Sequence, residues 1–479
     1  MKTDTIAAIA TALSDSGIGI IRISGSESVE IADKIYTSKN KKKHLKNVMS
    51  HTIHYGFIVD NDEIVDEVMV TVMRAPKSYT AEDTIEINCH GGVLMMRRIL
   101  ELVLKAGARM AEPGEFTKRA FLNGRMDLSE AEAIMDMIHA KSELSLKYSV
   151  RQLKGSVSQK IKSLRSKLIY EIAFIESALD DPEHISLEGY QETLKEKLTD
   201  LILEIDALLN SVENGKIVKE GINTVIVGKP NAGKSSFLNL LIGEEKAIVT
   251  DIAGTTRDVL EEQIKLHGIC LNVIDTAGIH FTEDIVEKIG VQKARKYAAD
   301  ADLILYVVDS SVPLDENDMD IMQTIGSKKC IAILNKTDLE AVVTEKTLWD
   351  AFMESSMKIS AADGNADFEK KSDRIHIIKT STKDVTGIDV FEETIQNMFF
   401  KGEISFENEV YITNIRHKEA LVETKNSLLL VQKSINNNMP EDFYTVDLMN
   451  AYTSLGLIIG EEVSDDLVNE IFSKFCMGK

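Results

Sequence analysis

Residues 228–236 read GKPNAGKSS, and the sequence on either side of them indicates a strand before the stretch and a helix after it. A short β-branched run lies at 224–227, and helix-forming residues follow at 237–242. A glycine-rich loop in that position wraps its backbone N–H groups around phosphate oxygens. Lys234 would contact the β- and γ-phosphates, and the Ser235 hydroxyl would bind Mg²⁺. The stretch therefore predicts a phosphate-binding loop, and with it an α/β nucleotide-binding domain.

Alternating strand and helix patterns continue from this loop to about residue 400. The further strands are expected at 271–274, 303–308, 330–334 and 375–378. Such alternation predicts a parallel sheet with helices on both faces and a ligand at the carboxyl ends of the strands. The charged, alanine-rich residues 339–373 are expected to form one helix and a mobile insertion.

Two short motifs after the loop are placed to hold Mg²⁺ and to sense the γ-phosphate. The sequence DTAG at 275–278 follows a predicted strand, so that Asp275 would support the Mg²⁺ shell and the Gly278 N–H would contact the γ-phosphate. Thr255 and Thr256 lie in the loop DIAGTTRD, where one hydroxyl would bind Mg²⁺. Together these motifs predict a nucleotide-controlled switch.

The residues NKTD at 335–338 are expected to select the base. They follow the predicted strand 330–334, and the Asp338 carboxylate would accept hydrogen bonds from the N1–H and the N2 amine of guanine. Adenine presents an acceptor at N1, which would leave the carboxylate without a partner. The sequence STK at 381–383 would complete the pocket with backbone N–H groups. We therefore expect GTP rather than ATP.

These motifs define the expected GTP-binding residues. They are Asn231, Ala232, Gly233, Lys234, Ser235, Ser236, Thr250, Asp251, Ile252, Ala253, Gly254, Thr255, Thr256, Asp275, Thr276, Ala277, Gly278, Asn335, Lys336, Asp338 and Ser381. Ile279 stands where Ras-like enzymes have the Gln that orients the attacking water, so hydrolysis must use another group. The local candidates are His280, Glu283, Asp284 and Glu287, for each of which a surface charge is the simpler interpretation.

Composition and charge limit the number of domains and the kinds of site that the chain can contain. Its 479 residues suggest roughly three domains, and 44% hydrophobic residues can bury a core in each. No apolar run approaches the roughly 20 residues that span a bilayer, and no signal-peptide pattern opens the chain, so we expect a cytoplasmic protein without a membrane partner. The four cysteines are scattered, which favours neither a zinc site nor a disulfide framework. Three of them are expected in strands, as small apolar residues.

A net charge of −22 confines any RNA site to a local basic stretch. The candidates are KNKKKHLK at 39–46 and the basic helical residues between 151 and 167. For both, a solvated surface is the simpler interpretation.

The flanking sequence has other patterns. Residues 1–120 read as α+β, with strands expected at 18–23, 54–59, 68–73 and 84–88. Helical patterns cover the stretches on both sides of the nucleotide-binding domain, as expected for a helical bundle. The simplest account is a nucleotide-binding domain inserted into a helical domain. A conformational change of the inserted domain can then move the helical domain.

The flanking segments also contain blocks that nucleotide binding does not explain. They read GIIRISG at 19–25, SYTAEDTIEI at 78–87, EPGEFTKRAFLNGRMDL at 112–128 and CMGK at 476–479. With these blocks and the GTPase motifs, essentially the whole chain resembles the tRNA modification GTPase family called MnmE or TrmE.

The resemblance implies a multidomain architecture of α/β and α parts. An α+β domain similar to tetrahydrofolate-binding folds, through which the chain dimerises, is expected at 1–120. A helical domain is expected in two parts, at 121–217 and 401–479. A Ras-like P-loop GTPase domain is expected between them, inserted at 218–400.

The resemblance also implies the activity and the partners. The chain would be a K⁺-dependent, Mg²⁺-requiring GTP hydrolase that cycles between GTP and GDP and works as a homodimer. With a flavin-dependent partner protein, in a heterotetramer, it would add an aminomethyl or carboxymethylaminomethyl group at C5 of the wobble uridine of certain tRNAs.

The family's motifs carry several site residues over to this chain. Folate contacts to 5-formyl-tetrahydrofolate or a related tetrahydrofolate would come from Arg22, Glu82, Arg125 and Lys479. Metal ligands would be Ser235 and Thr256 for Mg²⁺, and Asn231, Thr250, Ile252 and Thr255 for K⁺. Glu287 would position the attacking water indirectly, and the family often has Lys where Arg125 stands.

Two questions stay open at the level of sequence. Cys476 is either an unreactive thiol in the tail or, as the resemblance favours, a functional thiol needed for tRNA modification; its context fits a prenylation signal poorly. The GTPase could instead serve ribosome assembly or RNA binding without modification chemistry. A membrane-remodelling GTPase is a third possibility, but the sequence lacks a basic amphipathic helix or a lipid anchor.

Overall fold

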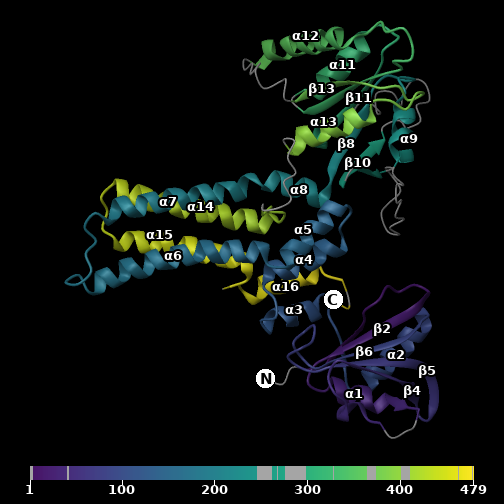
Figure 1. Cartoon of the computed structure of the whole chain (residues 1–479), viewed down its shortest axis with the longest axis vertical. Helices are drawn as coiled ribbons and strands as arrows, with labels where there is room; N and C mark the ends of the chain where they lie inside the picture. The colour runs from purple at the N-terminus through teal and green to yellow at the C-terminus, as the bar shows by residue number, and fades with distance from the viewer. Residues whose placement is uncertain are drawn as a thin grey trace. The chain divides into compact units, whose positions relative to one another are not determined.

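The computed structural model of the chain divides into two compact units (Figure 1). It describes residues 4–39, 43–244, 261–266, 268–275, 298–326, 328–363, 374–400, 410–461, 463–476 and 478. The first unit comprises Met1–Ile138, Val150–Leu203 and Glu419–Lys479, and the second comprises His139–Ser149 and Glu204–Lys418. Each unit is described by itself.

In the first unit, the described N-terminal residues form a seven-stranded sheet of order β3-β4-β5-β6-β2-β1-β7. Its strands are β1 (Ile6–Ile9), β2 (Ser16–Ser24), β3 (Tyr36–Ser38), β4 (Thr52–Asp60), β5 (Glu63–Met73), β6 (Thr84–Gly91) and β7 (Arg109–Met110). All neighbours pair antiparallel except β1 and β7. The strands expected from alternating apolar residues are confirmed, whereas β1, β3 and β7 were not expected.

Helices α1 (Ser28–Ile35) and α2 (Val93–Lys105) pack on one face of this sheet. Ile21 and Ile23 of β2 lie in the same buried cluster as Ile99 of α2. Successive side chains of a strand point to opposite faces. Arg22, between the two isoleucines, therefore lies on the face opposite α1 and α2.

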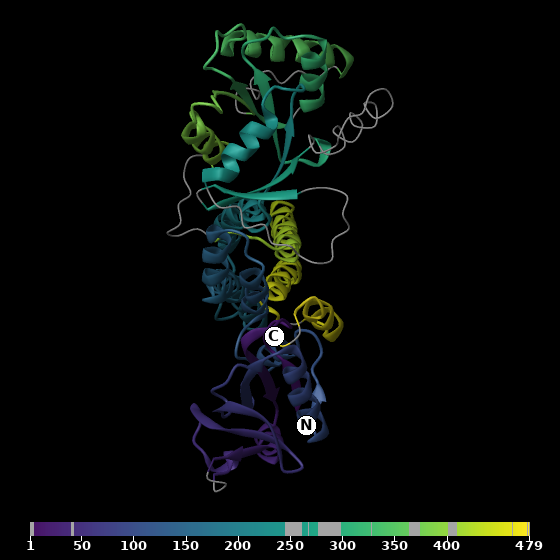
Figure 2. The same cartoon turned by 90° about the vertical axis from the view of Figure 1, so that its right-hand side faces the viewer.

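Helices make up most of the remaining first unit. They are α3 (Glu115–Leu122), α4 (Leu128–Ile138), α6 (Ser156–Asp180), most of α7 (Tyr190–Asn210), most of α14 (Ile415–Asn436), α15 (Asp442–Ile459) and α16 (Asp465–Ser473), with a short 3₁₀ helix at Leu45–Asn47. Figures 1 and 2 show the long helices α6, α7, α14 and α15 side by side. Lys195 of α7, for example, donates a hydrogen bond of 2.8 Å to Asn436 of α14. The expected helical bundle is confirmed.

The basic stretch on α6 is not a wholly solvated face. Arg165 is 5% exposed, forms an ion pair with Glu461 and lies 3.9 Å from the ring centroid of Tyr452. Lys162 lies 3.7 Å from Asp127. Arg165 therefore holds α6 against the end of α15, and the expectation of a surface charge is wrong for this residue.

The described part of the second unit contains a central six-stranded sheet of order β13-β12-β11-β8-β10-β9. Its strands are β8 (Ile222–Val227), β9 (Glu261–Leu266), β10 (Ile269–Asp275), β11 (Leu303–Asp309), β12 (Lys329–Asn335) and β13 (Ile375–Lys379). The expected strands are parallel, as predicted. The edge strand β9, which was not expected, is antiparallel to β10. Leu266 of β9 pairs with Ile269 of β10, and Gly268 has a φ of +87°.

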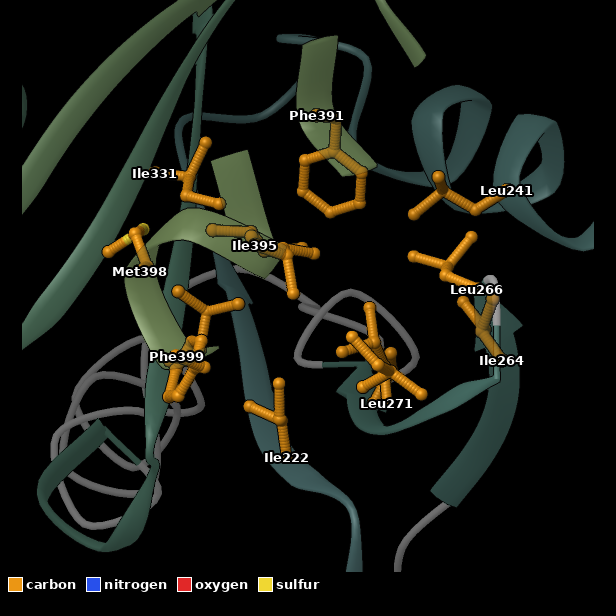
Figure 3. Packing of buried hydrophobic residues seen from close by; sticks show 14 of the residues in the cluster. Ile222, Leu241, Ile264, Leu266, Leu271, Ile331, Phe391, Ile395, Met398 and Phe399 are labelled. Carbon is orange, nitrogen blue, oxygen red and sulfur yellow. The ribbon is translucent and has the colours of Figure 1, made fainter. Parts of the chain in front are cut away.

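Helices cover both faces of this sheet. They are α9 (Lys234–Glu244), α11 (Glu316–Ile325), α12 (Glu345–Asp363) and α13 (Ile388–Phe400), and the unit also contains α8 (Val212–Glu220) and the first part of α5 (Glu143–Leu153). Figure 3 shows Phe391, Ile395 and Phe399 of α13 packed with Leu241 of α9 and Leu271 of β10. On the other face, alternate residues of β11 and β12 pack against α11 and α12. The expected two-sided packing is confirmed.

Three of the cysteines lie buried in strands, as expected. Cys89 is in β6, Cys270 in β10 and Cys330 in β12, whereas Cys476 is exposed. Burial raises the pKa of the Cys89 thiol to about 11, which keeps it protonated and unreactive at neutral pH. Among the described residues, no helix is both long enough and apolar enough to span a bilayer.

Candidate functional site

The phosphate-binding loop connects β8 to α9 at the carboxyl edge of the sheet. Gly228 has a φ of +149° and Gly233 a φ of +99°, values that favour glycine. A Cβ on Gly233 would lie 2.1 Å from the Asn335 amide nitrogen, and one on Gly228 would lie 2.3 Å from the Val307 carbonyl oxygen. Both glycines are therefore required by close approach as well as by backbone conformation.

Lys234 crosses this loop. Its ammonium group donates hydrogen bonds of 2.8 Å to the carbonyl oxygens of Gly228 and Lys229. Asn231, between the two glycines, is exposed and has a φ of +62°, a left-handed conformation that Asn tolerates. The loop thus carries a cation and an amide at the position where phosphate binding is expected.

Asn335 joins the loop that contains NKTD to the phosphate-binding loop. Its side-chain nitrogen donates a hydrogen bond of 3.0 Å to the carbonyl oxygen of Ala232. Its side-chain oxygen lies 3.5 Å from the Thr380 hydroxyl and 3.4 Å from the Thr382 backbone nitrogen. Asn335 is fully buried. One side chain therefore connects three loops that follow β8, β12 and β13.

Asp338 lies beside the loop that follows β13. The Ser381 hydroxyl is 3.2 Å from its carboxylate, and the Lys383 ammonium group is 3.8 Å away. The pairing of β12 with β13 brings these segments together. The Asp338 carboxylate is thereby held next to the sequence STK.

Lys336 is fixed by a residue that the sequence did not single out. Its ammonium group lies 2.5 Å from Asp309 at the end of β11. Burial raises the pKa of Asp309, but hydrogen bonds from Lys336 and Ser311 outweigh burial, and the pKa lies below its ordinary value. Asp309 therefore holds Lys336 as an ion pair.

Several predicted nucleotide residues lie outside the described part of the chain. They are Thr250, Asp251, Ile252, Ala253, Gly254, Thr255, Thr256, Thr276, Ala277, Gly278 and Glu287. Asp275 is the last residue of β10. The described residues from the phosphate-binding loop, NKTD and STK converge as predicted.

A second cluster lies on the face of the N-terminal sheet opposite α1 and α2. Arg22 of β2 and Glu86 of β6 are cross-strand partners, and their side chains are 2.9 Å apart. Arg22 also donates a hydrogen bond of 3.0 Å to the carbonyl oxygen of Gly478, while the Cys476 carbonyl accepts one of 3.3 Å from the Gly114 N–H. The C-terminal tail is therefore attached to the N-terminal sheet.

Tyr79 lies between two of the predicted folate residues. The guanidinium carbons of Arg22 and Arg125 are 5.2 Å and 4.8 Å from its ring centroid. Arg125 also donates a hydrogen bond of 2.8 Å to the Tyr79 carbonyl, and the Tyr79 hydroxyl lies 2.8 Å from that of Thr117. The Tyr79 ring thus lies next to the guanidinium groups of both Arg22 and Arg125.

Glu82, the third predicted folate residue, is held by Arg119. The two side chains lie 3.2 Å apart, and the Ser24 hydroxyl donates a hydrogen bond of 2.8 Å to Glu82. Arg119 also contacts Glu115 and Asp4, each at 2.9 Å. The structure therefore brings Arg22, Glu82 and Arg125 into one region, while Lys479 lies outside the described residues.

Burial raises the pKa of the Glu115 carboxyl, but hydrogen bonds from Arg109, the Glu112 N–H and Arg119 outweigh burial, so the pKa lies below its ordinary value. Glu115 is 8% exposed and is held by these donors as a carboxylate. The carboxylate in turn keeps Arg119 in place beside Glu82.

Sequence reasoning missed four residues that build these sites: Tyr79, Glu86, Arg119 and Asp309. Tyr79, Glu86 and Arg119 lie within the blocks 78–87 and 112–128. Their membership of these blocks, as polar or aromatic residues, is the signal that could have identified them. Nothing in the sequence indicates the register that pairs Arg22 with Glu86. Asp309 follows a predicted strand, which is the signal that could have found it.

Two family models match the chain. One is described as the MnmE helical domain and matches residues 128–476, and the other, described as the GTP-binding protein TrmE N-terminus, matches residues 5–125. Together they cover the N-terminal sheet, the helices and the sheet of the second unit.

Curated relatives match over the full length. A tRNA modification GTPase MnmE from Lachnoclostridium phytofermentans is 57% identical over 479 residues, with 100% of both chains covered. Proteins of the same name from Thermoanaerobacter pseudethanolicus and Acetivibrio thermocellus are 46% and 47% identical, again with 100% of both chains covered. The solved G domain of the T. maritima FeoB iron transporter is 25% identical and covers 37% of this chain and 98% of its own, with a TM-score of 0.24.

Proposed function

Because the chain belongs to the MnmE family, we propose that it is a GTPase that takes part in tRNA modification, as the names of its relatives indicate. The observation that carries the GTPase assignment is the hydrogen bond from Asn335 to the Ala232 carbonyl. This bond supports the proposal because it joins the loop that contains NKTD to the loop at 228–236, at one edge of the sheet.

Guanine is the base that the site favours. The Asp338 carboxylate accepts hydrogen bonds and cannot donate them when ionised, so it complements two donors on the guanine edge. Adenine would place an acceptor against it, at a cost of about 1–3 kcal/mol for an unpaired buried group. Ser381 and Lys383 support the same carboxylate.

Mg²⁺ would be held by Ser235 and Thr256, with support from Asp275. Ser235 is exposed in the first turn of α9, next to the lysine that crosses the loop. Hydroxyl and carboxylate oxygens suit a hard cation. When bound, Mg²⁺ neutralises charge on the β- and γ-phosphates. The protein contributes the N–H groups of the loop and the ammonium group of Lys234.

K⁺ would be held by Asn231 with Thr250, Ile252 and Thr255. The exposed amide of Asn231 supplies an oxygen ligand of the kind that hard cations take. A monovalent cation supplies positive charge beside the phosphates, where other GTPases use an arginine. Glu287 would position the attacking water indirectly, because Ile279 cannot hydrogen-bond with it.

The N-terminal cluster would bind 5-formyl-tetrahydrofolate or a related tetrahydrofolate. Arg22 and Arg125 offer cations for its carboxylates, Glu82 offers an acceptor for its ring N–H groups, and Tyr79 offers an aromatic face. Lys479 would add a further cation. Arg22 and Glu82 already have protein partners, so the ligand must share these bonds or replace them.

The tRNA step would take place at the wobble uridine, where the chain and a flavin-dependent partner add an aminomethyl or carboxymethylaminomethyl group at C5. The chain would act as a homodimer, joined through residues 1–120, within a heterotetramer. Its GTPase domain at 218–400 would be inserted between helical parts at 121–217 and 401–479. Cys476 is exposed, as a functional thiol must be.

Hydrolysis by the purified full chain tests the GTPase proposal. We expect turnover of GTP but not of ATP, and faster turnover in KCl than in NaCl at equal ionic strength. Equal rates in the two salts would contradict the K⁺ assignment, and equal turnover of ATP would contradict the base assignment.

A further inference from the structure

Lys229 is the second residue of the phosphate-binding loop, and its side chain points away from the loop toward α11. Its ammonium group lies 2.7 Å from Asp318 and 3.0 Å from Asp315. The Asp318 side chain is 1% exposed and that of Lys229 is 19% exposed. A charge pair shielded from water to this extent is stronger than a surface pair.

The start of α11 gives Lys229 a rigid anchor. One oxygen of Asp315 accepts hydrogen bonds from the backbone N–H groups of Asn317 and Asp318, at 3.0 Å and 3.3 Å. Asp318 accepts one of 2.9 Å from the Asp315 N–H and one of 2.7 Å from the hydroxyl of Tyr306, which is fully buried in β11. The two carboxylates are therefore fixed by the helix cap and by the sheet.

The backbone of Lys229 connects this anchor to the phosphate-binding lysine. Its carbonyl oxygen accepts hydrogen bonds of 2.8 Å from the Lys234 ammonium group and 3.3 Å from the Ala232 N–H. The chain between these residues includes Asn231 in a left-handed conformation. Unusual backbone conformations persist when the surroundings hold them in place.

We propose that Lys229 is a positioning residue for the nucleotide: by joining the phosphate-binding loop to Asp315 and Asp318, it keeps the loop's N–H groups and Lys234 in the geometry that binds phosphate. The inference rests on the proposed GTPase function and adds a residue to its site. Lys229 acts through Lys234 and the loop and does not itself touch the nucleotide. Preorganisation of this kind strengthens binding because the loop loses less conformational freedom when the ligand binds.

Dissociation of a fluorescent GDP analogue from the full chain tests the proposal. Lys229→Met keeps the length of the side chain and removes its charge, and we expect GDP to bind about tenfold more weakly, as for a loss of about 1.4 kcal/mol. Lys229→Arg should restore affinity to within about threefold, since it restores a cation that can reach the carboxylates. With GTP saturating, kcat should change far less than KM, because the loop is then filled.

Two matched variants separate positioning from general effects. Asp315→Asn keeps an oxygen that can cap α11 and removes the charge that faces Lys229, so it should weaken GDP binding in the same direction. If Lys229→Met does not fold, Asp315→Asn tests the proposal in its place. Lys147→Met removes an exposed lysine that pairs with Glu143 on α5, and it should leave GDP binding unchanged.

The outcomes are distinguishable. GDP affinity within twofold of wild type in both Lys229→Met and Asp315→Asn would overturn the positioning role while leaving the GTPase proposal intact. A lower unfolding temperature with an unchanged affinity would assign Lys229 a structural role only, and would also overturn the inference. Failure of the wild-type chain to bind GDP would overturn the proposed function, and this inference with it.

Discussion

Asn335 donates a hydrogen bond of 3.0 Å to the carbonyl oxygen of Ala232, across a sequence separation of 103 residues. Both residues are buried, so the bond is shielded from competing water. The loop that contains NKTD and the phosphate-binding loop are consequently linked, and we expect a change in either loop to affect the other.

Replacing Asn335 with Ala should weaken nucleotide binding. The Ala232 carbonyl would lose its donor, at a cost of about 1–3 kcal/mol, which corresponds to roughly ten- to hundredfold in affinity if the loop relaxes in the free protein. Titration with a fluorescent GDP analogue measures the effect. Thr380→Val is the matched control, because it removes only the longer contact of 3.5 Å to the same side chain. Equal losses in the two variants would contradict the role given to Asn335.

Asp338→Asn should change which nucleotide is preferred. An amide presents a donor to the guanine edge where the carboxylate accepted, so we expect GTP affinity to fall at least about tenfold. Xanthine carries a carbonyl at C2 in place of the amine, and XTP should bind the variant better than the wild type. Competition between the two nucleotides measures the switch. Asp384→Asn is the control, because Asp384 lies near the same Ser381 hydroxyl; an equal switch there would count against Asp338.

Asn231→Ala should impair the response to K⁺ more than it impairs GDP binding. The amide oxygen would be lost as a cation ligand, whereas the backbone N–H groups of the loop would remain. We expect the ratio of GTP turnover in KCl to that in NaCl to fall toward one, with GDP affinity within about threefold. Normal K⁺ stimulation in this variant would refute the assignment of Asn231.

Glu115→Gln should alter the dependence of stability on pH. The folded-state pKa of Glu115 lies below its ordinary value because hydrogen bonds to Arg109 and Arg119 outweigh burial. Its contribution is therefore complete above the unfolded pKa of about 4.3 and is lost as the pH falls through the lower folded value. The variant should be less stable at pH 7, by about 1–3 kcal/mol, and should lose less stability than the wild type on acidification.

Calorimetric unfolding between about pH 7 and pH 3 measures this difference. Glu101→Gln is the control for the loss of one negative charge, since Glu101 lies 3.9 Å from Arg98 on an exposed surface. If the free energy of unfolding decreased equally on acidification in Glu115→Gln and in the wild type, Glu115 would contribute nothing to the acid sensitivity of the fold.

The sequence predicted the phosphate-binding loop, the strands that carry the motifs and their convergence. This was possible because parallel strands end at one edge of a sheet, so residues that follow them must meet there. The long helices were also predicted, because their apolar residues recur at helical spacing. Helix α11 was missed, although Asp315 and Asp318 form a capping box in which Asp takes the place of Glu at the fourth position.

The N-terminal cluster could be predicted only in part. Arg22, Glu82 and Arg125 came from the family's motifs, and their grouping depends on how β2 and β6 pair. A shift of one residue would place Arg22 in the core and remove its contact with Glu86. Strand β9 (Glu261–Leu266) was not predicted at all, and its antiparallel pairing with β10 was therefore also missed.

Mass spectrometry of wobble nucleosides tests the central claim most directly. We expect tRNA from a strain that lacks this chain to be deficient in C5-modified wobble uridine, and the wild-type chain to restore the modification. Lys147→Met should restore it equally, whereas Lys234→Ala, which removes the cation that crosses the phosphate-binding loop, should not. Identical wobble nucleosides with and without the chain, or full restoration by Lys234→Ala, would contradict a GTPase coupled to tRNA modification.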